Sequence, residues 1–147
     1  MPASAAPLAL LAAAAFAGAA LYVSVAEHPA RMGLDDEAAL RQWKPSYAKG
    51  KIMQAGLALV GSLLAFWVWW EERNLLWMIG GLVLLANWPF TLAAILPTNH
   101  RLEAIPPGAP SPETRALLAR WGRLHAVRAA LGTAAALIML CAFYCRL

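Results

Sequence analysis

Charged side chains are scarce in this sequence. Asp, Glu, Lys and Arg make up 14% of its 147 residues, against about 25% in ordinary soluble domains. Hydrophobic residues make up 61%, and the mean hydropathy is +0.57. This composition argues against a soluble globular domain, and against disorder, which requires low hydrophobicity and high net charge. The abundance of alanine and leucine over β-branched residues favours helix over strand.

Several enzyme motifs are also missing. The sequence has no HExxH or CxxCH motif, no glycine-rich phosphate loop and no Gly-x-Ser-x-Gly elbow, which argues against nucleotide use and ordinary serine hydrolysis. His28, His100 and His125 have no recognisable ligand spacing, so no metal site is predicted. Two cysteines, Cys141 and Cys145, are too few for a disulfide framework. We interpret them as small apolar side chains of a membrane helix.

Four long stretches without a charged residue predict four transmembrane helices. They are Met1–Ala26, Ile52–Trp70, Asn74–His100 and Ala129–Cys145. A bilayer core needs about 20 helical residues, and a helix satisfies every backbone polar group in lipid. We therefore predict an all-α, integral membrane four-helix bundle. It is a single membrane domain over residues 1–147, with helices at about 5–28, 46–70, 75–99 and 112–145.

Prolines and polar residues suggest where these helices begin and end. Pro29 is expected to end the first helix, because the residue before a proline avoids the helical region. The acidic run Asp35-Asp36-Glu37 predicts a short interfacial helix in the first cytoplasmic loop, ending near Lys44-Pro45. Ser111 and Pro112 are expected to cap and open the fourth helix. A signal peptide is the alternative for the first stretch, but it lacks a basic start.

The basic residues orient the bundle. Ten of the twelve Lys and Arg residues lie in the links between helices one and two and between helices three and four. The positive-inside rule places these links in the cytoplasm and both termini outside. This asymmetry explains the basic patches without a nucleic-acid partner. Four tryptophans flank the outer turn and predict an aromatic belt at the interface with lipid: Trp67, Trp69, Trp70 and Trp77.

Each predicted helix carries one narrow polar stripe. At 100° per residue, the members of each stripe fall within about 60° of one another. The stripes are Ser24, His28 and Arg31; Tyr47, Lys51 and Gln54; Asn87, Thr91 and Thr98; and Trp121, His125 and Arg128. Arg115, Arg120 and Arg123 point elsewhere and predict a separate, solvated face. The topology brings most of these stripes to the cytoplasmic end of the bundle.

Two interpretations of the stripes are open. Polar side chains between membrane helices can simply hold a bundle together, and we favour this for Asn87, Thr91 and Gln54. Pro89 frees the Leu85 carbonyl, which Asn87 and Thr91 would satisfy. Ionisable groups that face a bundle interior are costly and usually functional, and we favour this for His28, Arg31, His125 and Arg128. Glu27 would either pair with Arg31 or orient a histidine ring.

The same residues carry a resemblance to a known family. The elements are Glu27-His28-Pro29-Ala30-Arg31; Trp43 with Tyr47 and Gly50; Asn87-Trp88-Pro89-Phe90-Thr91; Pro97-Thr98-Asn99; and Trp121-x-x-x-His125-x-x-Arg128. Together they resemble a family of small four-helix membrane proteins that includes the fungal anthrone oxygenases. The first element is closer to the family's bacterial branch, which implies a bacterial plasma membrane.

The resemblance implies oxidation of an apolar aromatic small molecule by O₂ within the lipid bilayer, without a cofactor. It implies that His125 or His28 acts as a base and that Arg128 or Arg31 stabilises an oxyanion. Asn99 and Tyr47 would orient the substrate, with Gln54 beside them, and Trp43 and Trp121 would stack on its rings. The alternative is a non-enzymatic membrane protein: a haem binder through His28 and His125, a lipid binder or an accessory subunit.

Overall fold

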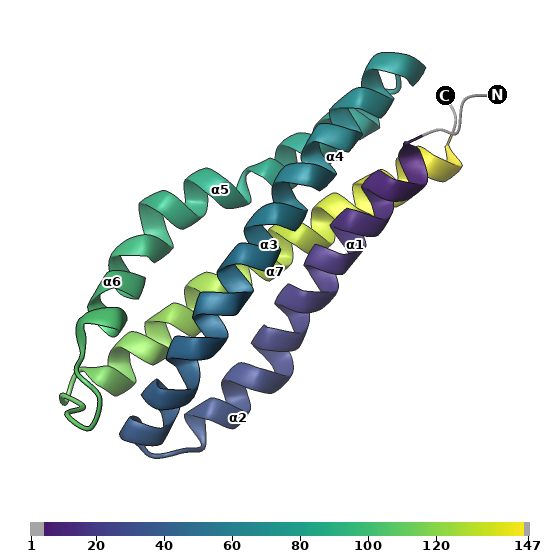
Figure 1. Cartoon of the computed structure of the whole chain (residues 1–147). Coiled ribbons are helices and arrows are strands. Elements are labelled where there is room, and N and C mark those ends of the chain that lie inside the picture. Colours follow the sequence, from purple (N-terminus) through teal and green to yellow (C-terminus); the bar gives the residue numbers. More distant parts are fainter. Residues whose placement is uncertain (1–4, 146–147) are drawn as a thin grey trace.

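The computed structural model describes residues 5–145, and all the regular structure in that range is helical (Figure 1). Four helical columns are long and apolar enough to cross a membrane: Ala6–Met32, Asp36–Glu72, Leu75–Ala104 and Thr114–Tyr144. The predicted all-helical membrane bundle is therefore confirmed. The elements, with η for a π-helical segment, are α1 (Ala6–Tyr22), η1 (Val23–Glu27), α2 (His28–Met32), α3 (Asp36–Glu72), α4 (Leu75–Leu85), α5 (Asn87–Phe90), η2 (Thr91–Ile95), α6 (Leu96–Ala104) and α7 (Thr114–Tyr144).

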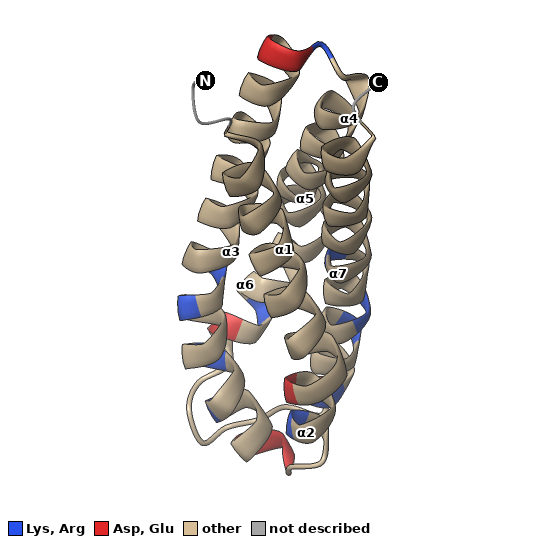
Figure 2. Ribbon diagram, turned by 90° about the vertical axis from the view of Figure 1, so that its right-hand side faces the viewer, with Lys and Arg blue, Asp and Glu red and all other residues tan. Residues whose placement is uncertain are grey.

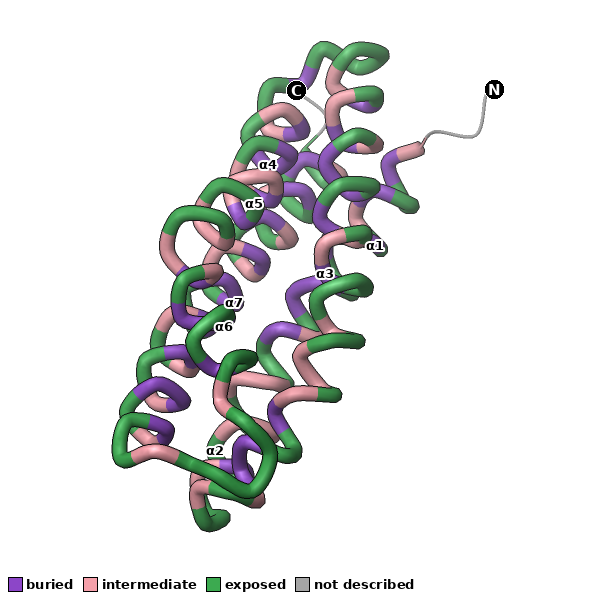
Figure 3. Tube along the Cα trace, turned by 60° about the vertical axis from the view of Figure 1, so that its left-hand side comes forward, coloured by how far each residue is buried: buried purple, intermediate pink, exposed green. Residues whose placement is uncertain are grey.

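The columns form a ring in which α1 packs against α3 and α7, and α4 packs against the same two helices. The start of α1, the α3–α4 link and the end of α7 share one end of the bundle. Most basic residues lie in the opposite half, whereas among residues 5–145 the first end carries charge only around the α3–α4 link (Figure 2). Buried residues form an inward stripe along each column (Figure 3). The polar and apolar halves of the molecule are thus separated along its length.

Small residues bring the helices close together in the apolar half. A Cβ atom on Gly61 of α3 would lie 2.8 Å from a Leu84 methyl of α4 and 3.3 Å from the Ala12 Cβ of α1. A Cβ on Gly132 of α7 would lie 2.5 Å from the ring of Phe16. Membrane helices associate through this kind of close packing, since lipid supplies no hydrophobic drive between them. The apolar half therefore holds the four columns together.

Two prolines that were expected to end helices lie inside helical columns. Pro29 does not end the first helix, because η1 precedes it and α2 continues to Met32. In η1 the N–H of His28 donates to the carbonyl of Val23, five residues back. This wider turn absorbs the proline, which has no N–H and crowds the preceding turn. Pro45 lies within α3, at an end of the helix where Arg41, whose carbonyl loses its donor, is exposed.

The prediction of a separate short helix in the first loop is therefore wrong. Residues from Asp36 form the first turns of α3 itself, and Asp35 caps that helix by accepting a hydrogen bond from the N–H of Ala38 at 2.8 Å. The acidic residues do begin a helix, as predicted. That helix then continues through Pro45 to Glu72, because a single missing donor bends a helix without forcing it to stop.

The third column bends at Ala86, between α4 and α5, and then contains η2 before Pro97. Asn87 donates to the carbonyl of Leu84 at 3.0 Å, so the expected repair of the Leu85 carbonyl by this side chain is wrong. The column ends at Ala104 rather than near residue 99. The bend and the π-helical segment lie next to Pro89 and Pro97, each of which removes one backbone donor.

The remaining differences concern the ends of helices and one tryptophan. The last helix begins at Thr114, and the Ser111 side chain makes no cap; instead the Thr114 hydroxyl accepts from the Ser111 N–H at 3.0 Å. Trp67 and Trp70 are exposed, as a lipid-facing belt requires, but Trp77 is fully buried in the core. Trp77 was assigned to the belt from its position in the sequence, and its helix face turns it inward.

We expect Gly132→Ala to destabilise the bundle by about 1–3 kcal/mol, the usual cost of overpacking a well-packed core. Phe16 is fully buried, and the added methyl would lie 2.5 Å from its ring. The matched control is Gly56→Ala, where the methyl meets nothing within 4 Å. Thermal unfolding in detergent measures both. Equal melting temperatures for the two variants would contradict the close packing described here.

Candidate functional site

His125 and Arg128 lie one turn apart on α7 and face the interior of the charged half. Their exposed fractions are 3% and 9%. Arg120 and Arg123, on the same helix, are exposed, as the helical spacing predicts. The last helix therefore has a solvated basic face and a separate buried face that carries an imidazole and a guanidinium.

The imidazole of His125 is held from two sides. Its Nδ1 lies 3.2 Å from the hydroxyl of Ser24 on η1. The indole of Trp121, one turn earlier on α7, stacks on its ring with centroids 4.9 Å apart and planes at 27°. These contacts fix the ring's orientation. Within residues 5–145, no hydrogen bond is recorded for Nε2, which leaves that nitrogen available to a bound molecule.

The guanidinium of Arg128 has no carboxylate partner in the described part of the chain. No hydrogen bond or ion pair is recorded for it there, and its Nε is fully buried without a partner. Its recorded ring contact is with Phe16, whose centroid lies 5.6 Å from Cζ. A buried cation without a compensating group is costly. This cost is recovered when an acceptor oxygen or an anion binds beside it.

Arg31 is buried as well but is fully paired. Its guanidinium donates to Glu27 at 2.5 Å, and to Gln42, while lying 5.4 Å from the Trp121 ring centroid. Glu27 also accepts from Gln42 at 3.1 Å and from Ser46. Of the two roles open to Glu27, the structure thus has the pair with Arg31. The cluster of Glu27, Arg31, Gln42 and Ser46 ties the first column to α3.

His28 contacts Trp121 as well. Its ring is 5.5 Å from the Trp121 ring, and it fills the space beside Gly122, where a Cβ would collide with the imidazole. A glycine at this position is what allows the two helices to approach so closely. Trp121 therefore contacts both histidine rings.

Tyr47 and Asn99 meet at the opposite wall. The amide of Asn99 donates to the Tyr47 hydroxyl at 3.0 Å. Trp43 stacks on Tyr47 with centroids 4.8 Å apart and meets Trp121 edge-on at 6.0 Å. Trp43 is fully buried, so it supports the two rings that face the site.

A pocket of about 190 Å³ brings six of the nine predicted site residues together. They are Tyr47, Gln54, Asn99, Trp121, His125 and Arg128. His28, Arg31 and Trp43 are not part of its lining and lie directly behind it. Among the other lining residues, the sequence shows Glu27 only as a partner for Arg31 or a histidine and Lys51 only as part of a polar stripe, and no sequence pattern points to Ser46.

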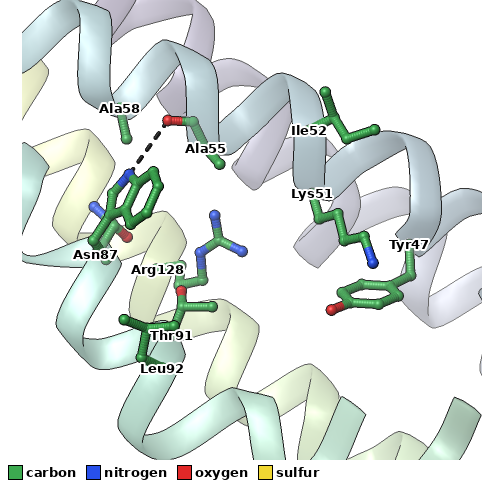
Figure 4. Close-up of a pocket in the computed structure, with 10 residues that line it drawn as sticks. Tyr47, Lys51, Ile52, Ala55, Ala58, Asn87, Thr91, Leu92 and Arg128 are labelled. Atoms are coloured by element: carbon green, nitrogen blue, oxygen red, sulfur yellow. Dashed lines mark hydrogen bonds between the residues drawn. The ribbon is translucent and has the colours of Figure 1, made fainter. Parts of the chain in front are cut away.

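A second pocket, of about 300 Å³, lies between α3 and the α5–η2 segment. We call it the α3–α5 chamber. It shares Tyr47, Lys51 and Arg128 with the first pocket. Figure 4 shows the Arg128 guanidinium pointing into it, opposite the Tyr47 ring. Asn87 and Thr91, interpreted from the sequence as structural, line this chamber, as does Trp88.

Metal-ligating side chains do not cluster in the described residues. No group of three His, Cys, Asp or Glu side chains that could hold an ion occurs among them. His100 is exposed on α6. Cys141 and Cys145 are free thiols on the outer surface of the last helix and its end.

Comparison with known proteins gives one match. A family model described as anthrone oxygenase matches residues 43–138. No curated protein and no solved structure matches the chain. The matched segment begins after Glu27, His28 and Arg31 and includes Tyr47, Asn99, His125 and Arg128. The match covers well over half of the sequence and agrees with the four membrane-spanning columns, so this chain belongs to the anthrone oxygenase family.

Proposed function

We propose that the protein is a membrane oxygenase that uses O₂ to oxidise the acidic methylene of a planar aromatic ketone to a quinone. One observation carries the proposal. In the described part of the chain, a buried histidine with a free Nε2 and a buried arginine without a counterion line the same pocket, one helical turn apart. A base beside an unpaired cation is what a reaction through an enolate requires.

The chemistry begins with removal of a proton. His125 Nε2 takes a proton from the methylene, and the electron pair delocalises onto the ring carbonyl oxygen. Arg128 stabilises the resulting oxyanion, in a site where low polarity strengthens the interaction. We assign the base to His125 and the cation to Arg128, rather than to His28 and Arg31, because only the first two line the pocket.

The carbanion then reacts with O₂. It transfers electrons to O₂ and forms a carbon–oxygen bond, and the resulting peroxide anion takes back the proton held by His125. The hydroperoxide formed in this way loses water to become a carbonyl. One oxygen atom thus ends in the quinone and the other in water, while the carbon loses two hydrogens. We propose that the carbanion is electron-rich enough to need no metal or organic cofactor.

The remaining pocket residues bind and orient the substrate. Tyr47 and Asn99, already joined to each other, offer a hydroxyl and an amide to the substrate's oxygens, and Gln54 lies on the same wall. Trp121 offers a ring face near the base. Arg31, Glu27 and His28 act from behind by holding Trp121 in place, and Trp43 holds Tyr47.

We also propose an orientation in the membrane. The basic half of the bundle would face the cytoplasm of a bacterium, and both termini would lie outside, following the positive-inside rule. Figure 2 is the basis for this proposal, since the blue segments gather in one half. The pocket would then lie near the cytoplasmic face, within the bilayer.

We expect His125→Ala to lower quinone formation by about 10²–10⁴-fold, the usual contribution of a positioned general base. Binding of the aromatic should change far less. The assay follows an anthrone under O₂ with purified protein in detergent. If the variant oxidises the anthrone as fast as the parent, His125 is not the base. A parent that never exceeds the spontaneous rate would instead favour a binding protein.

We expect Arg128→Lys to be damaging as well, because an ammonium does not reproduce the planar, multi-donor guanidinium. The matched control is Arg120→Lys, an exposed position on the same helix, which should be nearly silent. Melting temperatures are measured for both. Equal turnover by the two variants would remove Arg128 from the mechanism.

Absorption spectroscopy and elemental analysis of the purified protein test the cofactor-free proposal. We expect a colourless protein without stoichiometric metal and with full activity. A Soret band or a metal at one equivalent would overturn it, and would favour the haem-binding alternative through His28 and His125.

Cysteine labelling in intact cells tests the orientation, in a background where Cys141 and Cys145 are serine. An impermeant thiol reagent should label Glu71→Cys, in the last turn of α3, and should not label Ala109→Cys, in the loop before α7. Both native residues are exposed. The opposite pattern would invert the proposed topology.

A further inference from the structure

The α3–α5 chamber exists because the third column bends. Above the chamber, Gly81 of α4 lies so close to α3 that a Cβ would be 3.2 Å from the Ala65 Cβ. The column then turns at Ala86 and Pro89, and passes into η2. A proline lacks the donor that would keep a helix straight. The bend leads α5 and η2 away from α3, as Figure 1 shows, and the chamber occupies the space between them.

The mouth of the chamber is apolar and lies on the outer surface of the bundle. Ile52, Leu92 and Trp88 line it and are 73%, 58% and 39% exposed. Lys51, beside Ile52, is the last charged residue of α3 before a charge-free run that ends at Trp70. In a membrane, these exposed apolar side chains face lipid chains just inside the headgroup level. The Trp88 indole donates to the Ala55 carbonyl at 3.3 Å across the mouth.

The floor of the chamber is the unpaired guanidinium of Arg128. Figure 4 shows it at the centre of the lining, between α3 and η2. An occupant must therefore be apolar enough to come from the lipid and must bring an acceptor oxygen for the cation. A lipid hydrocarbon chain is apolar enough, but it carries no acceptor oxygen for the cation.

We propose that the α3–α5 chamber is a lateral entrance through which a flat aromatic ketone passes from the bilayer to Arg128. Ala55 and Trp88 limit its width and select the substrate. This inference rests on the proposed function for the identity of the substrate. The chamber adjoins the His125 pocket, because Tyr47, Lys51 and Arg128 line both. The substrate's oxygen meets the cation first, and its methylene then reaches the base.

Narrowing the mouth tests the entrance. Ala55→Leu adds bulk to the chamber wall and leaves the backbone acceptor for Trp88 in place. With the anthrone supplied in liposomes, we expect kcat/KM to fall about 10–100-fold, the scale on which a few methylene groups discriminate in an apolar pocket, with kcat at saturation nearly unchanged. The control is Ala48→Leu, the same change at an exposed position of α3 outside the described pockets, which should match the parent.

A binding measurement separates the entrance from the chemistry. Protein containing 5-fluorotryptophan is titrated with anthraquinone in liposomes and observed by ¹⁹F NMR, with resonances assigned from single Trp→Phe variants. We expect the Trp88 resonance to shift and Ala55→Leu to weaken the binding about 10-fold or more. This measurement involves no turnover. If the Trp88 resonance shifts in a protein that oxidises no anthrone, the entrance proposal is supported and the proposed function is rejected.

Three results would overturn the proposal that the chamber is an entrance. In the first, saturating anthraquinone shifts the resonance of Trp121, in the His125 pocket, and leaves that of Trp88 unchanged. In the second, a lipid with a chain-attached nitroxide broadens the Trp88 resonance and anthraquinone does not displace it, so that a lipid chain fills the chamber. In the third, the turnover rate follows the aqueous concentration of the anthrone rather than its mole fraction in the bilayer.

Discussion

Inside a bilayer every backbone N–H and C=O group needs a partner from the protein, and four prolines of this chain sit where they remove a donor. Pro29 and Pro97 each follow a π-helical segment. Pro45 lies within α3, and Pro89 lies within α5. The helices continue through all four. The geometry of the charged half follows from how the chain accommodates these positions, because each accommodation bends a column or shifts its register.

The site depends on those accommodations. The first π-segment carries Ser24, which contacts His125, and Glu27, which binds Arg31. The second precedes the helix that carries Asn99. The bend at Ala86 and Pro89 opens the α3–α5 chamber beside Arg128. A π-turn changes which residues face inward, and the two π-segments lie at two walls of the same candidate site.

The apolar half supplies the close helix packing that the charged half lacks. Contacts made through Gly61, Gly81 and Gly132 hold the columns in close packing. The charged half is built differently, from aromatic stacking and from polar bonds between columns, so it can enclose pockets. A bundle packed closely along its whole length would have no space beside Arg128. A bundle open along its whole length would lack the contacts that fix the helices.

Two arginines in this half differ in what they can do. Arg31 has Glu27 and Gln42 as partners and lies against Trp121, so its charge is compensated within the protein. Arg128 has no such partner in the described residues, although it is nearly as deeply buried. An uncompensated cation in a low-polarity site attracts an acceptor from outside. The two side chains are similarly buried. Their partners distinguish them: Arg31 is a supporting group, whereas Arg128 can bind a ligand.

The sequence by itself determined the number of spans, the helical class and the inward face of the last helix, because charge-free runs and helical periodicity are properties of neighbouring residues. Placing His125 and Arg128 on one face and Arg120 on another needed nothing beyond 3.6 residues per turn. The tertiary structure decided which arginine is paired, that Trp77 is buried, and that Pro29 and Pro45 lie within helices. It also decided that Asn87 and Trp88 line a chamber. These properties depend on contacts between columns and on how each helix accommodates a proline, so patterns among neighbouring residues do not show them.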